Sequence, residues 1–315
     1  MSIVVAVVRP PVSLQLAQPA REIPTSRPDR TWAFEPKFDG WRAVLFADAG
    51  MLQSRRDTDL SGRFPEIIDA ATQVGDAVLD GEVVALRDGR LDFGALTSTP
   101  RARARSGVSI YFVAFDLLAR SASDVRSEPY HARRSRLELL FDGVAPPLQL
   151  IPTTTDRQVA LTWMRPEASV VGIEGVVAKL LDAPYRAGRG GAWLKIRQLT
   201  VVDAVVVGVT GDPERPAEVV LARRDDAGHL RQIGLSLPLS SGLSQQIGQL
   251  VTPTGEPPLP VSTGVFGRGQ TQFRPALPEL VVEVEVEASV ESFANRLRPR
   301  VHRVRLDLDP DDLDA

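Results

Sequence analysis

The sequence predicts an α+β fold in two parts: a mixed α/β domain over residues 1–200, then a small all-β unit about the size of an OB-type barrel over 201–315. Three observations support this prediction. A length of 315 residues suits two domains, each able to bury a core. Apolar runs with strand character accompany a helical segment in the first part. After "WLKIRQLT" the chain becomes β-rich, which places the boundary near residue 200.

The first part contains three strong strand candidates and a helix. "AVLDGEVVAL" (77–86), "VSIYFVAFDLL" (108–118) and "GIEGVVAKLL" (172–181) are apolar runs of strand length. "HARRSRLELLF" (131–141) has leucines at helical spacing, which predicts a helix with its arginines on the outer face. The opening "MSIVVAVVRPP" predicts an early strand or extended arm, because its apolar run is short and lacks a basic leader.

The second part repeats strand-like runs between turn-rich segments. The runs are "VVDAVVVGVT" (201–210), "AEVVLARR" (217–224), "HLRQIGLSL" (229–237) and "ELVVEVEVE" (279–287). A long Pro/Gly stretch at 252–269 separates the last run from the others. This pattern predicts a compact β unit without internal repeats.

Composition excludes several classes of site. The chain has no cysteine, so it has neither disulfides nor a thiolate nucleophile or metal site. Its histidines, His131, His229 and His302, are too scattered for a zinc site. No stretch approaches the ~20 apolar residues of a membrane span. We therefore expect a cytoplasmic protein without membrane contact.

The charge is distributed unevenly along the chain. The net charge is only −3, but arginines cluster at 100–107, 131–136 and 296–305, whereas the C-terminal tail is acidic. A globally acidic protein with basic stripes can bind a phosphate backbone. Charge alone does not decide between this interpretation and the alternative, in which the arginines form ordinary solvated faces.

Lysine is rare enough to be informative. Lysine and arginine total 37, of which only Lys37, Lys179 and Lys195 are lysines, so 37 − 3 leaves 34 arginines. Arginine supplies a surface cation, but its guanidinium keeps its proton at ordinary pH and cannot act as a nucleophile. Lys37 begins the sequence Lys-Phe-Asp-Gly, in which Asp39 shares its strand face and the glycine permits a tight turn.

All three lysines lie within an ordered series of motifs. In chain order these are "EPKFDGWR", "SRR" (54–56), "LDGE" (79–82), "FVAFDLL" (112–118), "EGVVAK" (174–179) and "WLKIR" (193–197). The series resembles the nucleotidyltransferase superfamily of ATP-dependent DNA ligases, RNA ligases and mRNA capping enzymes. It is most similar to the short ATP-dependent bacterial DNA ligases linked to end joining and repair. The resemblance runs from about residue 11 to residue 310 and implies an adenylation domain followed by an OB-fold domain.

The resemblance implies that Lys37 attacks the α-phosphate of ATP and forms a lysine–AMP adduct. Lys195 and a bound Mg²⁺ (or Mn²⁺) would favour the deprotonated amine. Asp39 would oppose that shift, so we expect it to act as a metal or hydroxyl ligand. Glu174 is the better metal ligand, and Glu82 contacts ribose or metal, since Mg²⁺ prefers oxygen ligands and phosphates. Strand-end carboxylates in surface salt bridges are the alternative.

The same resemblance assigns the remaining nucleotide contacts. Arg55 would touch ribose or phosphate, and Glu35 would read the adenine amino group, through its side chain or backbone. Phe115 would stack on adenine; without the motif order, a core phenylalanine is the better reading, and Phe112 is an equal candidate. Lys195 and Arg197 would hold the α-phosphate, with arginine where the family usually has lysine. Lys179 is assigned a phosphate contact.

The C-terminus departs from the family pattern. Ligases usually end this domain with Arg-x-Asp-Lys, which orients the leaving pyrophosphate. The best match here is Arg305-Leu306-Asp307-Leu308, in which leucine replaces lysine. If nearby arginines do not supply the missing charge, self-adenylation should be slow while the later steps survive.

The resemblance implies nicked double-stranded DNA as partner, bound by a monomer mainly through phosphates. End-joining or repair proteins are possible further partners that the sequence does not identify. An RNA ligase or GTP-using capping enzyme, and a non-catalytic nucleic-acid-binding relative, are the alternatives. The predicted DNA contacts are Arg101, Arg103, Arg105, Arg298, Arg300, Arg303 and Arg305.

Overall fold

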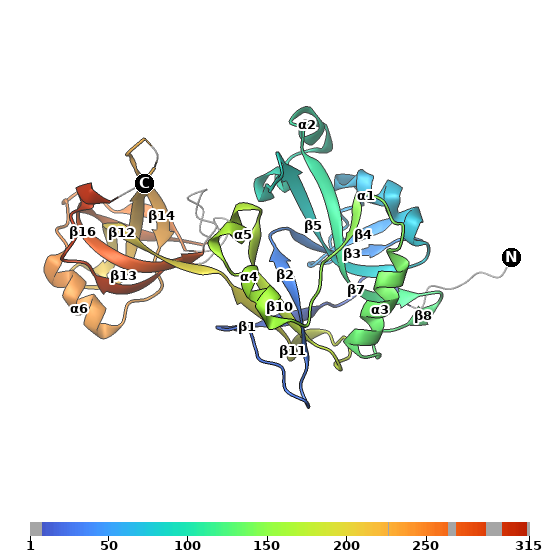
Figure 1. The fold of residues 1–315 in the computed structure, drawn as a ribbon. Helices are drawn as coiled ribbons and strands as arrows, with labels where there is room; N and C mark the ends of the chain where they lie inside the picture. The colour runs from blue at the N-terminus through green and yellow to red at the C-terminus, as the bar shows by residue number, and fades with distance from the viewer. Residues whose placement is uncertain (1–7, 226, 264–268, 288–297, 314–315) are drawn as a thin grey trace. The chain divides into compact units, whose positions relative to one another are not determined.

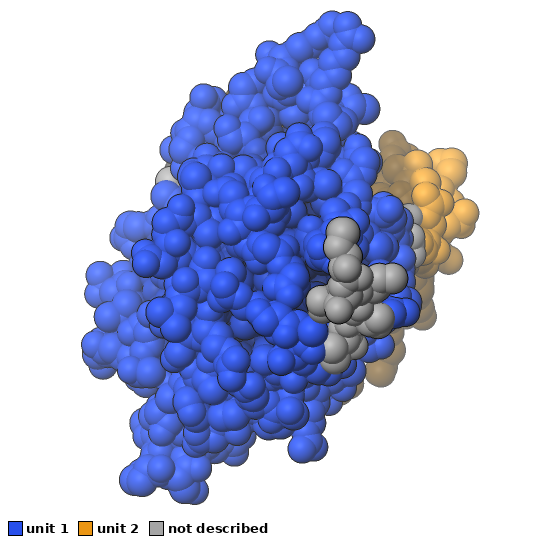
Figure 2. All heavy atoms as spheres, turned by 90° about the vertical axis from the view of Figure 1, so that its right-hand side faces the viewer, with its two compact units in different colours: residues 1–197 blue, residues 198–315 orange. Residues whose placement is uncertain are grey.

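The computed structural model describes residues 8–225, 227–263, 269–287 and 298–313. The chain divides into two compact units, Met1–Arg197 and Gln198–Ala315, which Figure 2 colours separately. The sequence analysis placed its boundary at residue 200, three residues further along the chain. The mixed α/β and β-rich architectures confirm the predicted fold class.

Unit 1 contains a four-stranded sheet with the order β1-β11-β10-β2 (Figure 1). β1 runs parallel to β11, whereas β10 is antiparallel to both of its neighbours. Two of the predicted lysine motifs therefore lie on adjacent strands, β2 and β10. The strands are β1 (Gln15–Ala20), β2 (Trp32–Phe38), β10 (Ile173–Leu180) and β11 (Gly188–Arg197).

A seven-stranded sheet forms the rest of the unit 1 framework. Its main order is β4-β3-β5-β7-β8; β6 pairs with β5, and β9 pairs with β7. The strands are β3 (Trp41–Phe46), β4 (Met51–Ser54), β5 (Val78–Arg87), β6 (Arg90–Leu91), β7 (Ser109–Arg120), β8 (Ser123–Asp124) and β9 (Leu148–Leu150).

Short helices complete unit 1. The α-helices are α1 (Pro65–Ala70), α2 (Pro100–Arg105), α3 (Tyr130–Leu140), α4 (Arg157–Thr162) and α5 (Pro166–Val170). Single 3₁₀ turns are η1 (Ser61–Arg63), η2 (Ala71–Val74) and η3 (Phe93–Thr97).

The seven-stranded sheet buries both of its faces. On β7, Phe112 joins a core cluster with α1 and α3 residues, whereas Phe115 joins a different cluster that includes Trp193 of the four-stranded sheet. This alternation follows from the two-residue period of a strand. It places Phe115, and not Phe112, on the face that meets the sheet carrying Lys37.

The predicted strands and helix of unit 1 are confirmed by β5, β7, β10 and α3. The prediction that the arginines of 131–141 lie on the outer face is wrong for two of them. Arg133 is fully buried and Arg134 is 8% exposed, whereas Leu139 is 76% exposed. Arg133 tolerates burial because its guanidinium pairs with the buried carboxylate of Asp116 at 2.8 Å. Most of the predicted N-terminal arm lies outside the described residues.

Unit 2 is built around a six-stranded sheet with the order β14-β13-β12-β16-β15, and β17 pairs with β16. The predicted β-rich texture is confirmed, but the sequence analysis missed a helix, α6 (Ser241–Leu250), whose Ile247 enters the core. The strands are β12 (Leu199–Asp212), β13 (Arg215–Arg224), β14 (Leu230–Leu235), β15 (Leu259–Ser262), β16 (Gln270–Glu287) and β17 (Arg300–Val304). A 3₁₀ turn, η6 (Pro310–Asp312), follows β17.

Candidate active site

Lys37 lies near the end of β2, directly opposite Gly175 of β10. Its Nζ atom is 2.6 Å from Oε2 of Glu174, and the two side chains are 19% and 10% exposed. Gly175 has a φ of +149°, and an added Cβ would lie 2.1 Å from the Ile196 carbonyl oxygen. Only glycine fits this position without distortion. The Glu-Gly pair of "EGVVAK" therefore brings a carboxylate to the lysine of "KFDG" across adjacent strands.

Positive charge gathers beside Lys37. Lys195 lies on β11 opposite Val177 of β10. Burial lowers the pKa of the Lys195 ammonium, and neighbouring positive charges lower it further. These charges belong to Arg197, Arg189, Lys37 and Arg55. Such a cluster is suited to the negative charge of a triphosphate.

Glu82 of β5 brings a second carboxylate toward the same lysine. Burial raises the pKa of Glu82 to about 7, and Lys37 and Arg42 oppose this shift. The negative charges of Asp80 and Glu174 add to it. Glu82 and Glu174 therefore lie close enough to interact with each other as well as with Lys37.

The predicted metal residues do not form a complete protein site. Across the residues that the structure describes, no group of three or more histidine and acidic side chains is arranged to hold a metal ion. Glu82 and Glu174 lie on β5 and β10, and Asp39 is half-buried in the turn after β2. Mg²⁺ commonly binds through one or two carboxylates together with substrate phosphates, so these oxygen donors fit a cation that arrives with ATP.

The structure does not support Lys179 as a phosphate contact. Its side chain is 1% exposed, and its Nζ atom is 2.8 Å from both the Glu35 carboxylate and the Phe115 carbonyl oxygen. Glu35, the predicted adenine reader, is also buried, and its carboxylate accepts a hydrogen bond from Tyr130 Oη at 2.5 Å. Both side chains are occupied by protein partners.

Phe115 is a core residue in this structure. The residue is 9% exposed, and its ring packs edge-on against Trp193 with ring centroids 6.0 Å apart. Arg42 and Lys179 place cationic groups 5.3 and 4.7 Å from its centroid. Whether the ring also stacks on adenine stays a prediction.

Two of the predicted nucleotide contacts, Arg55 and Arg197, lie at strand ends. Arg55 directly follows β4 and is exposed, and Arg197 is the last residue of β11. Both contribute positive charge at Lys195. The structure thus brings together Lys37, Lys195, Arg55, Arg197, Glu82 and Glu174, and places Glu35 and Lys179 in a buried layer beside them.

The predicted DNA contacts of α2 divide into two groups. Arg101 and Arg105 are exposed, as a phosphate contact requires. The assignment of Arg103 needs correction, because its side chain is 2% exposed. It donates to the carbonyl oxygens of Arg63 and Ser98 at 2.7 Å and pairs with Glu66 at 3.2 Å. Arg103 is buried whereas Arg101 and Arg105 are exposed, because α2 packs one of its faces against the rest of unit 1.

In unit 2, Arg300 and Arg303 are exposed on β17, and Arg303 pairs with Glu283 at 2.7 Å. Arg298 is half-buried and pairs with Glu218 at 2.5 Å. Arg305 pairs with Asp203 at 3.0 Å, Asp307 at 2.8 Å and Glu283 at 3.8 Å, so three carboxylates already offset its charge. The hydrogen bond to Asp307 is the main cause that raises the pKa of Arg305.

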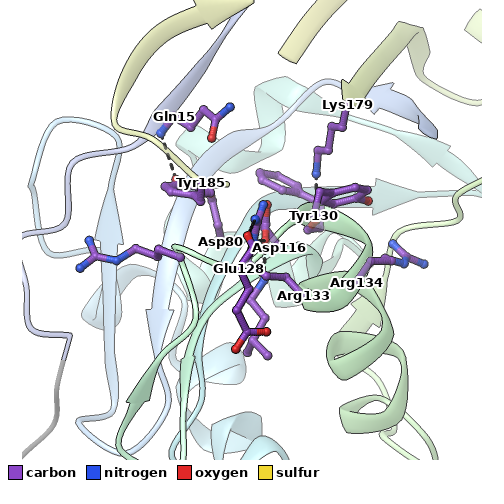
Figure 3. Close-up of polar contacts among 12 residues, drawn as sticks. Gln15, Asp80, Asp116, Glu128, Tyr130, Arg133, Arg134, Lys179 and Tyr185 are labelled. Carbon is purple, nitrogen blue, oxygen red and sulfur yellow. Dashed lines mark hydrogen bonds and ion pairs between the residues drawn. The ribbon is translucent and has the colours of Figure 1, made fainter. Parts of the chain in front are cut away.

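Sequence reasoning missed a buried polar layer behind the site (Figure 3). Asp80 accepts two hydrogen bonds from Arg42, at 3.0 and 2.6 Å, and one from Tyr185 at 2.7 Å. Tyr185 Oη also accepts from the Gln15 backbone amide at 3.0 Å. Arg42 and Asp80 stand inside "KFDGWR" and "LDGE", so their place in those motifs was a signal. Arg189 lies outside these motifs, and its only sequence signal was its position beside a pair of glycines.

These residues and the fold define a nucleotidyltransferase-type enzyme, and the chain belongs to the ATP-dependent DNA ligase family. Residues 14–197 match the family described as "ATP dependent DNA ligase domain". The chain is 33% identical over 241 residues to DNA ligase C2 of Mycolicibacterium smegmatis, a match that covers 72% of this chain and 66% of that protein. It is 29% identical to DNA ligase C of Mycobacterium tuberculosis, across 96% of this chain and 92% of that protein.

Solved structures support the same fold. The ligase domain of M. tuberculosis LigD aligns with a TM-score of 0.54 and 24% identity, covering 96% of this chain and 98% of that one. A mycobacterial DNA ligase D complexed with ATP and MES aligns with a TM-score of 0.53 and 25% identity over 96% of this chain and 97% of that one. The predicted enzyme class, an ATP-dependent DNA ligase, is confirmed. Among the described residues, no helix has the length and apolar character needed to cross a membrane.

Proposed function

We propose that Lys37 is the nucleophile of this ligase and that the chain seals nicks between a 5′-phosphate and a 3′-hydroxyl in double-stranded DNA. The observation that carries the proposal is the surroundings of Lys37. Its amine lies 2.6 Å from Glu174 and interacts electrostatically with Glu82 and Lys195, and Arg55, Arg189 and Arg197 add positive charge at Lys195.

In the first step the deprotonated Lys37 amine attacks the α-phosphorus of ATP. An N–P bond forms, and the bond between the α-phosphorus and the bridging oxygen breaks, so pyrophosphate leaves with the electron pair. Lys37 must first transfer a proton to the Glu174 carboxylate 2.6 Å away or to solvent, because a protonated amine has no free electron pair. Lys195 and the neighbouring arginines hold the phosphate charge during the transfer. Glu82 and Glu174 would hold a Mg²⁺ or Mn²⁺ ion, which would supply further charge neutralisation.

In the later steps the adenylate passes to the DNA. A 5′-phosphate oxygen attacks the adenylate phosphorus, the N–P bond breaks and the Lys37 amine is released. The 3′-hydroxyl then attacks the 5′-phosphorus, a phosphodiester bond forms and AMP leaves. The exposed Arg101 and Arg105 of unit 1, and Arg300 and Arg303 of unit 2, supply phosphate contacts that hold the duplex.

The first experiment incubates the protein with Mg²⁺ and α-labelled ATP or GTP, beside a Lys37→Ala variant. Label from ATP alone, absent in the variant, retained in alkali and released by hot acid as a phosphoramidate requires, would support the proposal. Label from GTP would contradict the nucleotide assignment. Label that persists on Lys37→Ala would contradict the assigned nucleophile. Absence of label on the wild-type chain would contradict self-adenylation.

We also propose that Leu308, in place of the family's usual lysine, limits self-adenylation. It follows the Arg305–Asp307 ion pair, whose arginine is already offset by carboxylates. Pre-adenylated nicked DNA should then be sealed several-fold faster than ordinary nicked DNA supplied with ATP, and Leu308→Lys should narrow the difference. Equal rates on the two substrates would refute this assignment.

We propose that the enzyme acts as a monomer in double-strand break repair by end joining, together with other repair proteins. Support comes from the end-joining protein LigD of M. smegmatis, which is 32% identical across 90% of this chain and 37% of that protein. Sealing of linear duplexes by the purified chain, alone and with an end-binding protein, compared with sealing of a single nick, tests this placement.

A further inference from the structure

Strands β2 and β10 carry a second lysine–glutamate pair besides the one at the candidate nucleophile. Lys179 Nζ lies 2.8 Å from Oε2 of Glu35, and the two side chains are 1% and 2% exposed. Glu35 precedes Lys37 by two residues, so both side chains project from the same face of β2. The register places Val177 of β10 opposite Glu35, and Lys179 reaches Glu35 diagonally.

Aromatic rings enclose the Lys179 ammonium. Its Nζ atom lies 4.3 Å from the ring centroid of Trp193, 4.7 Å from that of Phe115 and 4.9 Å from that of Tyr130. Figure 3 shows Lys179 extending from its strand toward Tyr130. Rings at these distances attract a cation through their electron-rich faces. The enclosure leaves the Lys179 side chain only 1% exposed, so the protein's own groups occupy the space around its ammonium.

The pair connects four elements of unit 1. Lys179 of β10 donates to the Phe115 carbonyl oxygen of β7 at 2.8 Å, which joins the four-stranded sheet to the seven-stranded sheet. Tyr130 of α3 donates to Glu35 Oε1 at 2.5 Å, and Arg134 of the same helix lies 4.0 Å from that oxygen. Glu35 is therefore fixed from two sides, two residues before Lys37.

We infer that the enclosed Lys179–Glu35 pair is a positioning element that sets the placement of β2, and through it the aim of Lys37 at the α-phosphate. This inference rests on the proposed role of Lys37 as nucleophile. Lys179 and Glu35 act through β2 without touching the reacting atoms. Small displacements matter here because a misplacement of about 1 Å can slow a reaction about 100-fold.

The test is a double-mutant cycle with Lys179→Met, Glu35→Gln and the double variant, compared with wild type. Single-turnover adenylation is followed over a range of ATP concentrations. We expect each single change to lower the maximal rate about 10- to 100-fold, with half-saturating ATP within about twofold of wild type. The double variant should be no slower than the slower single variant, since both changes break one unit.

Sealing of pre-adenylated nicked DNA provides a second readout. That step does not use the Lys37 amine as nucleophile, so the variants should keep most of their sealing rate. Multiplied losses in the double variant, a tenfold rise in half-saturating ATP, or an unchanged maximal rate would each overturn the inference. The first two outcomes would return Lys179 or Glu35 to direct substrate contact.

Folding is controlled with a milder pair of variants. Tyr130→Phe removes only the hydroxyl that bonds Glu35, whereas Tyr185→Phe removes a comparably buried hydroxyl that bonds Asp80. The inference requires Tyr130→Phe to slow adenylation more than Tyr185→Phe at equal thermal stability; equal rates would overturn it. A general loss of folding would instead lower the amount of adduct without changing its rate of formation. If the wild-type protein formed no adduct at all, the proposed function would fail. That outcome can therefore be told apart from a failure of the positioning inference.

Discussion

Two lysine–glutamate pairs lie on the same two strands with opposite polarity. In one, β2 supplies Lys37 and β10 supplies Glu174, 2.6 Å apart and 19% and 10% exposed. In the other, β2 supplies Glu35 and β10 supplies Lys179, 2.8 Å apart and 1% and 2% exposed. The distances are nearly equal, so geometry within the pair does not distinguish them.

Their surroundings make the difference. Lys37 has a partner at its amine and a cationic group nearby, with solvent access on the remaining side. Lys179 is surrounded by three aromatic rings, a carboxylate and a carbonyl oxygen. A lysine that can exchange its partner for substrate can perform chemistry, whereas a fully enclosed lysine serves to hold its neighbours. The comparison can be tested at both positions.

The largest effect is expected from Lys37→Arg. Arginine keeps the positive charge and can still pair with Glu174, but it cannot provide a deprotonated amine. Adenylation should fall by at least about 10³-fold, while the thermal midpoint stays within a few degrees of wild type. Measured adduct formation above a hundredth of the wild-type rate would contradict the difference drawn between the two pairs.

At the enclosed Lys179–Glu35 pair, removing the lysine should lower the stability of the protein. Lys179→Met leaves the buried Glu35 carboxylate without its main partner, which we expect to cost about 3 kcal/mol of unfolding free energy. The matched change Lys37→Met should cost less than Lys179→Met, because the Lys37–Glu174 pair is more exposed, at 19% and 10%. Urea denaturation of both variants at pH 7.5 measures the difference, and equal losses would remove the distinction.

Glu82, which lies beside the Lys37–Glu174 pair, should make the stability of the folded protein depend on pH. Its pKa is raised from 4.5 to about 7 in the folded chain, so the folded state binds this proton more tightly than the unfolded state. The stability that this proton contributes is complete below pH 4.5 and is lost as the pH rises through 7. Glu82→Gln should therefore stabilise the nucleotide-free protein by roughly 2 kcal/mol at pH 8 and little at pH 5. Thermal unfolding at the two pH values, without ATP or metal, checks this sign.

The smallest effect is expected from the arginines of α2, of which Arg101 and Arg105 are exposed and Arg103 is buried. Arg101→Ala with Arg105→Ala should lower the slope of log affinity against log salt by about 1.8, or about 0.9 for each phosphate contact. Arg103→Ala should leave the slope unchanged and lower stability, because this side chain is 2% exposed and bonded to the domain. Nicked-duplex binding at several salt concentrations tests both, and a flatter slope for Arg103→Ala would reverse the correction.

Local pattern accounts for the parts that sequence reasoning found. β5, β7 and β10 were predictable because each is a continuous apolar run bounded by turn residues, as expected for strands buried on both faces. The family resemblance carried by the ordered motifs also predicted that Lys37, Glu82, Glu174 and Lys195 lie together. Helix α6 was missed because serine, glutamine and glycine are typical of loops, although Ser240 caps its first turn and Ile247 reaches the core.

The sequence by itself determined the chemical inventory: three lysines among arginines, the carboxylates that accompany them and the order of strands that carries both. The tertiary structure decided which lysine is enclosed, which arginines of 101–105 and 131–136 are buried, and which face of β7 meets the four-stranded sheet. The physical reason is that burial depends on what packs above a side chain. Lys179 is enclosed by Trp193, Phe115 and Tyr130, residues 14 to 64 positions away in the sequence, and no local pattern around "EGVVAK" carries that information.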